Sequence, residues 1–372
     1  MKITAVDTFV IEVPQHPPIA PYQSRYIATS TTGALLVRIE TDQNVVGWGE
    51  APQKLPLKTV HFEGGEPFTG REAEALRPLL IGRDPTAIEA LYHDWGLDGK
   101  YVQSAVEMAL WDSLGKIAGQ PLYRLFGGLY REEVEVTCCM GIRPPHEAAE
   151  IARGYVAAGF TTLKTKAGRD PAEDLAMVRA IRDAVGDKLH LRIDPNMGYS
   201  PELALQLARD LEPYDLEYFE QPMPDGLIED SARIRRLTKT PLALNESVTS
   251  LARVLEILEL EAADFLLPDT YQCGGIRAVR SISEAAEAAG VACVFHCAHD
   301  FGLKTAAMLH VAGSSANFPL ANDCSYYALV EDYLVTPHVI RNGRMRVPHG
   351  PGLGVEVDMA KIRKYCVGSS VK

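Results

Sequence analysis

Six residues whose side chains can bind metals or move protons follow short apolar runs at nearly constant spacing. They are Lys166, Asp194, Glu220, Asn245, Asp269 and His296. Consecutive members lie 24 to 28 residues apart, which is the length of one strand, one helix and two loops. In a closed barrel of parallel strands, the loops at the carboxyl ends converge on one mouth. The spacing therefore predicts that these side chains share the mouth of one barrel.

Oxygen ligands come from three of these positions. Asp194 and Glu220 end successive runs, and the next run supplies either Asn245 or Glu246. Oxygen ligands without cysteine or histidine suit a hard cation, so we expect Mg²⁺, with Mn²⁺ as the alternative. Isolated acidic residues more often form salt bridges, but a shared position at successive strand ends favours a metal site.

Two lysines on one strand are candidate bases. Lys164 and Lys166 are two residues apart, so both point into the mouth. Neighbouring ammonium groups near a divalent cation lower each other's pKa and give a neutral amine that can accept a proton. The alternative, in which both lysines only pair with Asp194 and Glu220, stays open.

A carboxylate and a histidine end neighbouring strands. We expect Asp269 to orient the imidazole of His296 and to raise its basicity. His299, three residues later, is the rival histidine.

The segments between the runs have helical periodicity. Ser200 and Pro201 form an N-cap and N1 pair before the leucines of 203–211, and an apolar stripe over 175–185 ends at Gly186. Similar stripes cover 251–258 and 276–282. A doubly wound open sheet would place reactive side chains only at its switch point. Here six successive strand ends carry them, which favours a closed barrel. The fold class is α/β, a (β/α) barrel of modified TIM-barrel type.

The flanking regions predict a second domain. Residues 1 to about 50 alternate as a small antiparallel sheet with a hairpin turn at 42–44, and 14–31 form either a surface loop or a substrate lid containing Arg25 and Tyr26. Within a buried helix over 104–116, Asp112 and Lys116 are spaced for a structural ion pair.

The barrel should begin with a strand over 134–140 and end with an eighth strand between 314 and 322. We therefore divide the chain into an α+β capping domain with its lid (1–127), the barrel (128–330) and a segment that returns to the capping domain (331–372).

Composition restricts the partners. Lysine and arginine number 37 against 49 acidic residues, a net charge of −12 without a basic block, which argues against nucleic acid and anionic membranes. No signal-like or membrane-length apolar run is present, so the cytoplasm is the expected location. The seven cysteines include no C-x-x-C pair, and we expect buried thiols rather than disulfides or a zinc site.

Motifs along nearly the whole chain resemble the enolase superfamily, in its mandelate racemase, muconate lactonizing enzyme and acid-sugar dehydratase branch. The matching motifs are Gly47–Glu50, Ala109–Lys116, Lys164-x-Lys166, Asp194-Pro-Asn196, Glu220-Gln-Pro222, Asp269, His296 and Gly350–Asp358. The resemblance implies Mg²⁺ and a homo-oligomer. It also implies Lys166 as one base, Lys164 as its pKa-lowering neighbour and carboxylate contact, and His296 with Asp269 as the opposed acid or base.

Two positions depart from the family pattern. Racemase-like members place a glutamate ligand where Glu246 stands, whereas glucarate dehydratase is similar in using asparagine at the position of Asn245; we favour Asn245 and retain both. Their substrate-binding glutamate at the eighth strand end is replaced here by Asn322 or Asp323, so mandelate is not the expected substrate. Arg25, Tyr26, Asn196 and Asn322 are the candidate substrate contacts.

The leading functional hypothesis is a Mg²⁺-dependent dehydratase that converts an aldonate or aldarate into a 2-keto-3-deoxy acid. The alternative is a racemase, epimerase or cycloisomerase with the same two bases. A Schiff-base barrel using Lys164 or Lys166 as nucleophile, and a non-catalytic binding barrel, are the other classes considered.

Overall fold

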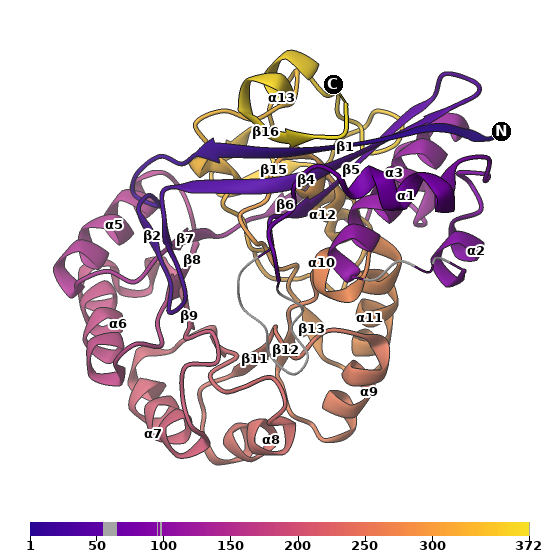
Figure 1. Cartoon of the computed structure of the whole chain (residues 1–372). Helices are drawn as coiled ribbons and strands as arrows, with labels where there is room; N and C mark the ends of the chain where they lie inside the picture. The colour runs from indigo at the N-terminus through magenta and orange to yellow at the C-terminus, as the bar shows by residue number, and fades with distance from the viewer. Residues whose placement is uncertain (55–64, 95, 97–98, 372) are drawn as a thin grey trace.

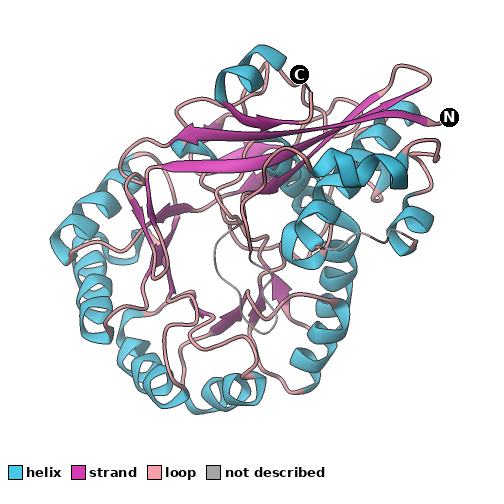
Figure 2. Ribbon diagram, in the orientation of Figure 1, coloured by secondary structure: helices cyan, strands magenta, loops and turns pink. Residues whose placement is uncertain are grey.

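The computed structural model of the chain describes residues 1–54, 65–94, 96 and 99–371. A curled sheet of parallel strands forms the centre, with helices around its outside and an antiparallel sheet across one side (Figures 1 and 2). No helix in the described part is long and apolar enough to span a bilayer. All seven cysteines are free thiols, as the sequence predicts.

Seven neighbouring parallel strands build the barrel sheet in chain order. They are β7 (Cys138–Met140), β8 (Thr162–Lys166), β9 (His190–Asp194), β10 (Tyr218–Glu220), β11 (Leu242–Leu244), β12 (Phe265–Leu266) and β13 (Ala292–Cys293). The helices around it are α5 (Pro145–Ala157), α6 (Pro171–Val185), α7 (Pro201–Leu211), α8 (Ile228–Leu237), α9 (Leu251–Glu259), α10 (Thr270–Cys273), α11 (Ile276–Ala288) and α12 (Gly302–Ser314). The predicted (β/α) barrel is confirmed.

Helix boundaries follow the capping residues. The Ser200 hydroxyl accepts a hydrogen bond from Leu203 N at the start of α7, and α6 ends at Gly186. In α9 the predicted apolar stripe is partly wrong, because Leu255 is exposed while Val254 and Ile257 are buried.

Residues 317–323 close the barrel in place of a regular eighth strand. On one side, Cys293 N donates to Asn317 O (2.9 Å). On the other, Thr137 N donates to Asn322 O (2.8 Å). The predicted eighth strand is thus wrong in form, since Pro319 interrupts the segment and lacks a backbone N–H for a continuous ladder.

The predicted first barrel strand is divided in two. Only β7 joins the barrel, whereas β6 (Glu133–Glu135) pairs antiparallel with β15 (Arg344–Arg346), which also pairs with β14 (Ile340–Arg341). Part of the segment after residue 331 therefore pairs with β6, which lies within the predicted barrel range 128–330, rather than with the capping domain. Its last strand, β16 (Cys366–Ser369), does pair with β1 as expected.

The capping domain is an antiparallel sheet in the order β16–β1–β4–β5. Its strands and helices are β1 (Ile3–Pro14), β4 (Thr31–Thr41), β5 (Val46–Pro52), α1 (Glu72–Leu80), α2 (Ile88–His93), α3 (Lys100–Ala118), α4 (Leu122–Leu125) and, near the C-terminus, α13 (Met359–Tyr365). α3 packs directly on β5, where a Cβ at Gly49 would lie 1.8 Å from Ala105 O. Glycine is required there by this close approach.

The predicted ion pair of the capping domain is confirmed, and the segment 14–31 lies at the barrel mouth. Lys116 Nζ lies 2.6 Å from the buried Asp112 carboxylate. The region 14–31 forms a small hairpin of β2 (Tyr22–Gln23) and β3 (Ala28–Thr29), and it contributes Tyr22 and Tyr26 to the wall of the cavity at the barrel mouth.

Candidate active site

The strand ends bring the predicted side chains together at one mouth. Lys166, Asn196, Glu246 and His296 line a single cavity, with Tyr22 and Tyr26 of the hairpin on its other wall. An adjoining cavity is bounded by Lys164, Asp323 and three cysteines, and it shares Lys166 with the first. Parallel strands of similar length produce this convergence, because their carboxyl ends meet at the same edge.

The two lysines form ion pairs with the acidic residues. Lys164 Nζ lies 2.7 Å from Glu220, 2.8 Å from Asp323 and 3.5 Å from Asp194. Lys166 pairs with Asp194. The sequence left open that the two lysines pair with Asp194 and Glu220, and these ion pairs are present: Lys164 contacts both acids and Lys166 contacts Asp194.

Among the side chains of the site, the ion pairs raise the pKa of both lysines, opposite to the lowering expected beside a divalent cation. Burial lowers the pKa of Lys164, but the carboxylates of Asp323, Glu220 and Asp194 outweigh it and hold the pKa well above its usual value. Burial likewise lowers the pKa of Lys166, and Asp194 more than compensates, so this pKa is also raised. The repulsion between the two ammonium groups is smaller than their attraction to the acids.

Glu246, not Asn245, faces Asp194. The Asn245 amide donates to Leu267 O (2.9 Å) and Gln272 Oε1 (3.1 Å), so it is committed to the barrel wall. Glu246 Oε1 accepts from Asn196 Nδ2 (3.1 Å), which also lies 3.3 Å from Asp194 Oδ2. Both side chains line the cavity, and this geometry favours Glu246 over Asn245.

The donor chemistry of three acidic residues suits a magnesium ion. Asp194, Glu220 and Glu246 are buried, and Glu246 Oε2 accepts no hydrogen bond. Burial first, and then the charge of Asp194, raises the pKa of Glu220 well above its usual value and that of Glu246 to about 7. Crowded buried carboxylates of this kind are stabilised by a cation, and an all-oxygen set suits Mg²⁺.

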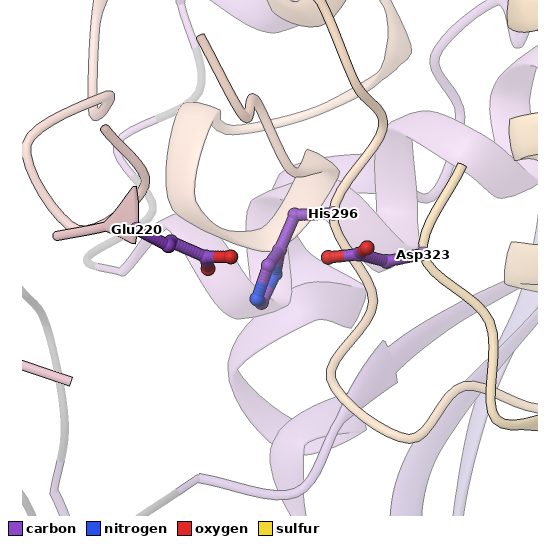
Figure 3. A group of neighbouring side chains, drawn as sticks. All are labelled: Glu220, His296 and Asp323. Atoms are coloured by element: carbon purple, nitrogen blue, oxygen red, sulfur yellow. The ribbon is translucent and has the colours of Figure 1, made fainter. Parts of the chain in front are cut away.

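A second group of possible ligands overlaps this one. Candidate ligand atoms of Glu220, His296 and Asp323 all lie within 4.8 Å of one another, and Figure 3 shows the three side chains converging. However, Asp323 already accepts hydrogen bonds from Lys164 and Arg192. We therefore favour the three carboxylates, with His296 available for proton transfer.

Asp269 orients His296 as the spacing predicts. His296 Nδ1 lies 3.0 Å from Asp269 Oδ2, and both residues are buried. Burial and then Lys164 lower the pKa of His296, although Asp269 acts in the expected, raising direction. His296 is consequently a neutral base near neutral pH. His299 also lines the cavity, but its Nδ1 lies 3.1 Å from Gln15 Nε2, and burial lowers its pKa to about 3.

The eighth strand end contributes Asp323 to the site, not Asn322. Asn322 is buried in the wall, where its Oδ1 accepts from Phe295 N (2.8 Å). Asp323 points at Lys164 and is held from behind by Arg192 Nη1 (3.2 Å). The prediction of Asn322 as a substrate contact is thus wrong.

The hairpin reaches the acidic residues through Asn196. Tyr26 OH donates to Asn196 O (2.6 Å), and the exposed Arg25 donates to Met197 O (2.9 Å) and to Tyr26 OH (3.0 Å). Arg25 therefore supports the hairpin, whereas Tyr26 and Asn196 line the cavity.

Sequence reasoning missed Lys304, whose Nζ lies 2.8 Å from Asp269 Oδ1. The available signal was weak: Lys304 follows Asp300 by four residues at the start of a helix. Arg192 was also missed, although its position two residues before Asp194 places it on the same face of β9.

A parallel (β/α) barrel under an α+β cap, with buried acids, two lysines and a histidine at its mouth, defines an enolase-type protein. Residues 5–127 match the mandelate racemase / muconate lactonizing enzyme N-terminal domain, and residues 147–361 match the enolase C-terminal domain-like family. The chain belongs to the mandelate racemase / muconate lactonizing enzyme family of the enolase superfamily.

Relatives of this chain have several different activities. It is 32% identical to L-Ala-D/L-Glu epimerase of Bacillus subtilis, covering 95% of this chain and 97% of the relative. It is 30% identical to D-xylonate dehydratase of Haloferax volcanii, covering 90% and 85%. A dipeptide epimerase from Cytophaga hutchinsonii, solved with Mg and the dipeptide D-Ala-L-Val, superposes with a TM-score of 0.89 at 25% identity over 98% of each chain. Family membership therefore indicates an enzyme, without deciding between isomerase and lyase.

Proposed function

We propose that this enzyme removes the proton next to a substrate carboxylate with the help of Mg²⁺, and that its reaction is the dehydration of an acid sugar. The observation that carries the proposal is that Lys166 and His296 line one cavity together with Glu246 and Asn196. Two proton carriers and a cation-binding acid beside one carbon acid are what this chemistry requires.

Asp194, Glu220 and Glu246 would hold the metal. When bound, Mg²⁺ supplies positive charge that stabilises the anion formed as the α-proton leaves. Lys164, held by Glu220 and Asp323, is placed to contact the substrate carboxylate. These residues bind and orient the substrate.

His296 and Lys166 would carry the protons. The lowered pKa of His296 favours a neutral imidazole that would take the α-proton, and Lys166, which lines the same cavity, would be the opposed proton carrier. His296 then returns its proton to the departing β-hydroxyl, which leaves as water, and the resulting enol becomes the 2-keto-3-deoxy acid. One proton and one hydroxyl leave the substrate, so the elimination is balanced.

The rest of the cavity suits a hydroxyl-rich molecule. The described lining includes hydroxyl and amide groups from Tyr22, Ser24, Tyr26, Gln53, Tyr101, Asn196, Asn245 and Tyr271. Among the described lining residues, the ionisable groups other than tyrosine and cysteine are Lys166, Glu246 and the two histidines. Neutral donors and acceptors are appropriate for sugar hydroxyls.

Epimerisation or racemisation is the second candidate, favoured by the epimerase relative and by the same pair of bases. Incubation with aldonic and aldaric acids in D₂O separates the two functions. Formation of a 2-keto acid supports dehydration, while deuterium at the α-carbon without keto acid supports epimerisation. Lys166→Met and His296→Asn serve as controls, since each should abolish turnover by the protein itself.

A further inference from the structure

Lys304 is a fully buried ammonium group directly behind the Asp269–His296 pair. Its Nζ lies 2.8 Å from Asp269 Oδ1 and 2.9 Å from Oδ2, so it contacts both oxygens. It also donates to Asp300 Oδ2 at 2.6 Å. Both acids are buried, which makes this a closed charge cluster at the edge of the cavity.

The position of Lys304 is fixed from the capping domain. Lys304 N, in the first turn of α12, donates to Glu50 Oε2 (3.0 Å), and Glu50 Oε1 accepts from Phe301 N (2.8 Å). Tyr333 OH also donates to Glu50, at 2.6 Å. The backbone that carries Lys304 is therefore held rigidly, and its side chain extends from a fixed point toward Asp269.

Burying an ammonium group is costly unless it is paired and hydrogen-bonded. Lys304 pairs with both buried acids, and its contact with both oxygens of Asp269 restricts the rotation of that carboxylate. Lys304 is absent from the cavity lining, and it is therefore not placed to touch a substrate.

We propose that Lys304 is the positioning residue for His296. By holding both oxygens of Asp269, it fixes the carboxylate so that Asp269 receives the Nδ1–H of His296. The other ring nitrogen, Nε2, then keeps its lone pair on the side where Glu220 and Asp323 lie close to the ring. The role of His296 in proton transfer rests on the proposed function, but the effect of Lys304 on the tautomer of His296 does not.

The test compares Lys304→Met with Lys116→Met. The control also removes a lysine that pairs with a buried aspartate, Asp112, but far from the mouth. Histidine ¹⁵N NMR, with the His296 signals located by His296→Asn, reports the tautomer without any substrate. We expect the Nδ1–H tautomer in the wild-type protein and in Lys116→Met, and its loss in Lys304→Met. An unchanged His296 spectrum in Lys304→Met overturns the proposal.

Proton exchange in D₂O provides the second readout, using both α-epimers of an acid that the wild-type enzyme processes. Lys304→Met should slow exchange on the His296 side about 10- to 100-fold, with a smaller effect on the epimer served by Lys166. Equal slowing of both epimers contradicts a positioning role. If the wild-type protein processes no acid, the proposed function fails. The NMR result still shows whether Lys304 sets the tautomer of His296. Should Lys304→Met not fold, Lys304→Gln keeps a donor and loses only the charge.

Discussion

Two groups of buried carboxylates in this protein differ in their hydrogen-bond donors. At the contact between the cap and the barrel, Glu107 accepts from Ile276 N (2.8 Å) and Arg277 N (2.9 Å). Asp112 accepts from Trp48 N and Leu353 N, both at 2.9 Å. Backbone donors from distant segments hold these two acids, as they hold Glu50.

At the barrel mouth, side chains provide most of the donors. Glu220 is paired with Lys164, and Glu246 accepts from the amide of Asn196. Asp194 pairs with Lys166 and accepts one backbone N–H, from Asn196 in its own loop. Side chains can move aside for a metal or a substrate, whereas backbone groups of packed helices cannot.

The pKa alone does not separate the two regions. Burial raises the pKa of Glu107 and of Glu246 to about 7 in each case. The difference is that Glu246 also has the charge of Asp194 beside it and an oxygen without a donor. Perturbed pKa values identify functional sites only when the surrounding groups are considered. We therefore expect mouth substitutions to change activity and interface substitutions to change stability.

The largest expected effect is the loss of a proton carrier. Lys166→Met or His296→Asn should lower kcat about 10²- to 10⁴-fold, because each removes a group that transfers a proton. Steady-state kinetics on a processed acid measures the change. Lys188→Met, at an exposed position, is the control. If the thermal midpoint falls as steeply as the activity, these residues would instead stabilise the fold, as the interface acids do.

Glu246→Gln should weaken Mg²⁺ binding by about 100-fold or more, because it removes a charged ligand. Asn245→Ala should leave Mg²⁺ affinity unchanged, since that amide contacts Leu267 and Gln272. Isothermal titration calorimetry with MgCl₂ compares the two variants. The reverse ranking would return Asn245 to the metal site.

Glu107 should make stability depend on pH. Its pKa is about 7 in the folded protein and near the usual value of 4.5 when unfolded, so only the folded state holds this proton between those values. Its contribution to the free energy of unfolding is therefore fully present below about pH 4.5 and is lost as the pH rises toward 7. Urea unfolding across this range should show a shallower pH slope for Glu107→Gln. An unchanged slope would assign the effect to other groups.

The smallest expected effect is at Lys116. Lys116→Met removes hydrogen bonds to Asp112 and to Val46 O (2.8 Å), and should lower the free energy of unfolding by about 1 to 3 kcal/mol. Urea denaturation measures this loss, and kcat should remain at the wild-type value. If kcat falls while the variant remains fully folded, the Lys116–Asp112 pair would affect the active site as well as stability.

Much of the fold and site was predictable because the signals are local or periodic. The constant strand-to-strand step placed Lys166, Asp194, Glu220, Asp269 and His296 at one edge, and caps such as Ser200 marked helix starts. The eighth strand was not predictable in form, because its proline-interrupted segment is held by hydrogen bonds to residues far away in sequence.

The choice between adjacent residues was decided only by the tertiary structure. Tyr218, Ala243, Leu267 and Val294 form one cluster, and strand alternation from Ala243 would select Asn245 for the site. β11 ends at Leu244, however, so alternation no longer applies and Glu246 turns toward Asp194. Asp323 replaces Asn322 for a similar reason, since no regular strand fixes its orientation.

The amino-acid sequence by itself determined the barrel, its acidic strand ends and the pairing of Asp269 with His296, because periodicity and spacing are written along the chain. The tertiary structure decided which neighbour faces the cavity and brought Glu50 to the helix that carries Lys304. Contacts between segments about 250 residues apart depend on packing, and no local pattern encodes them.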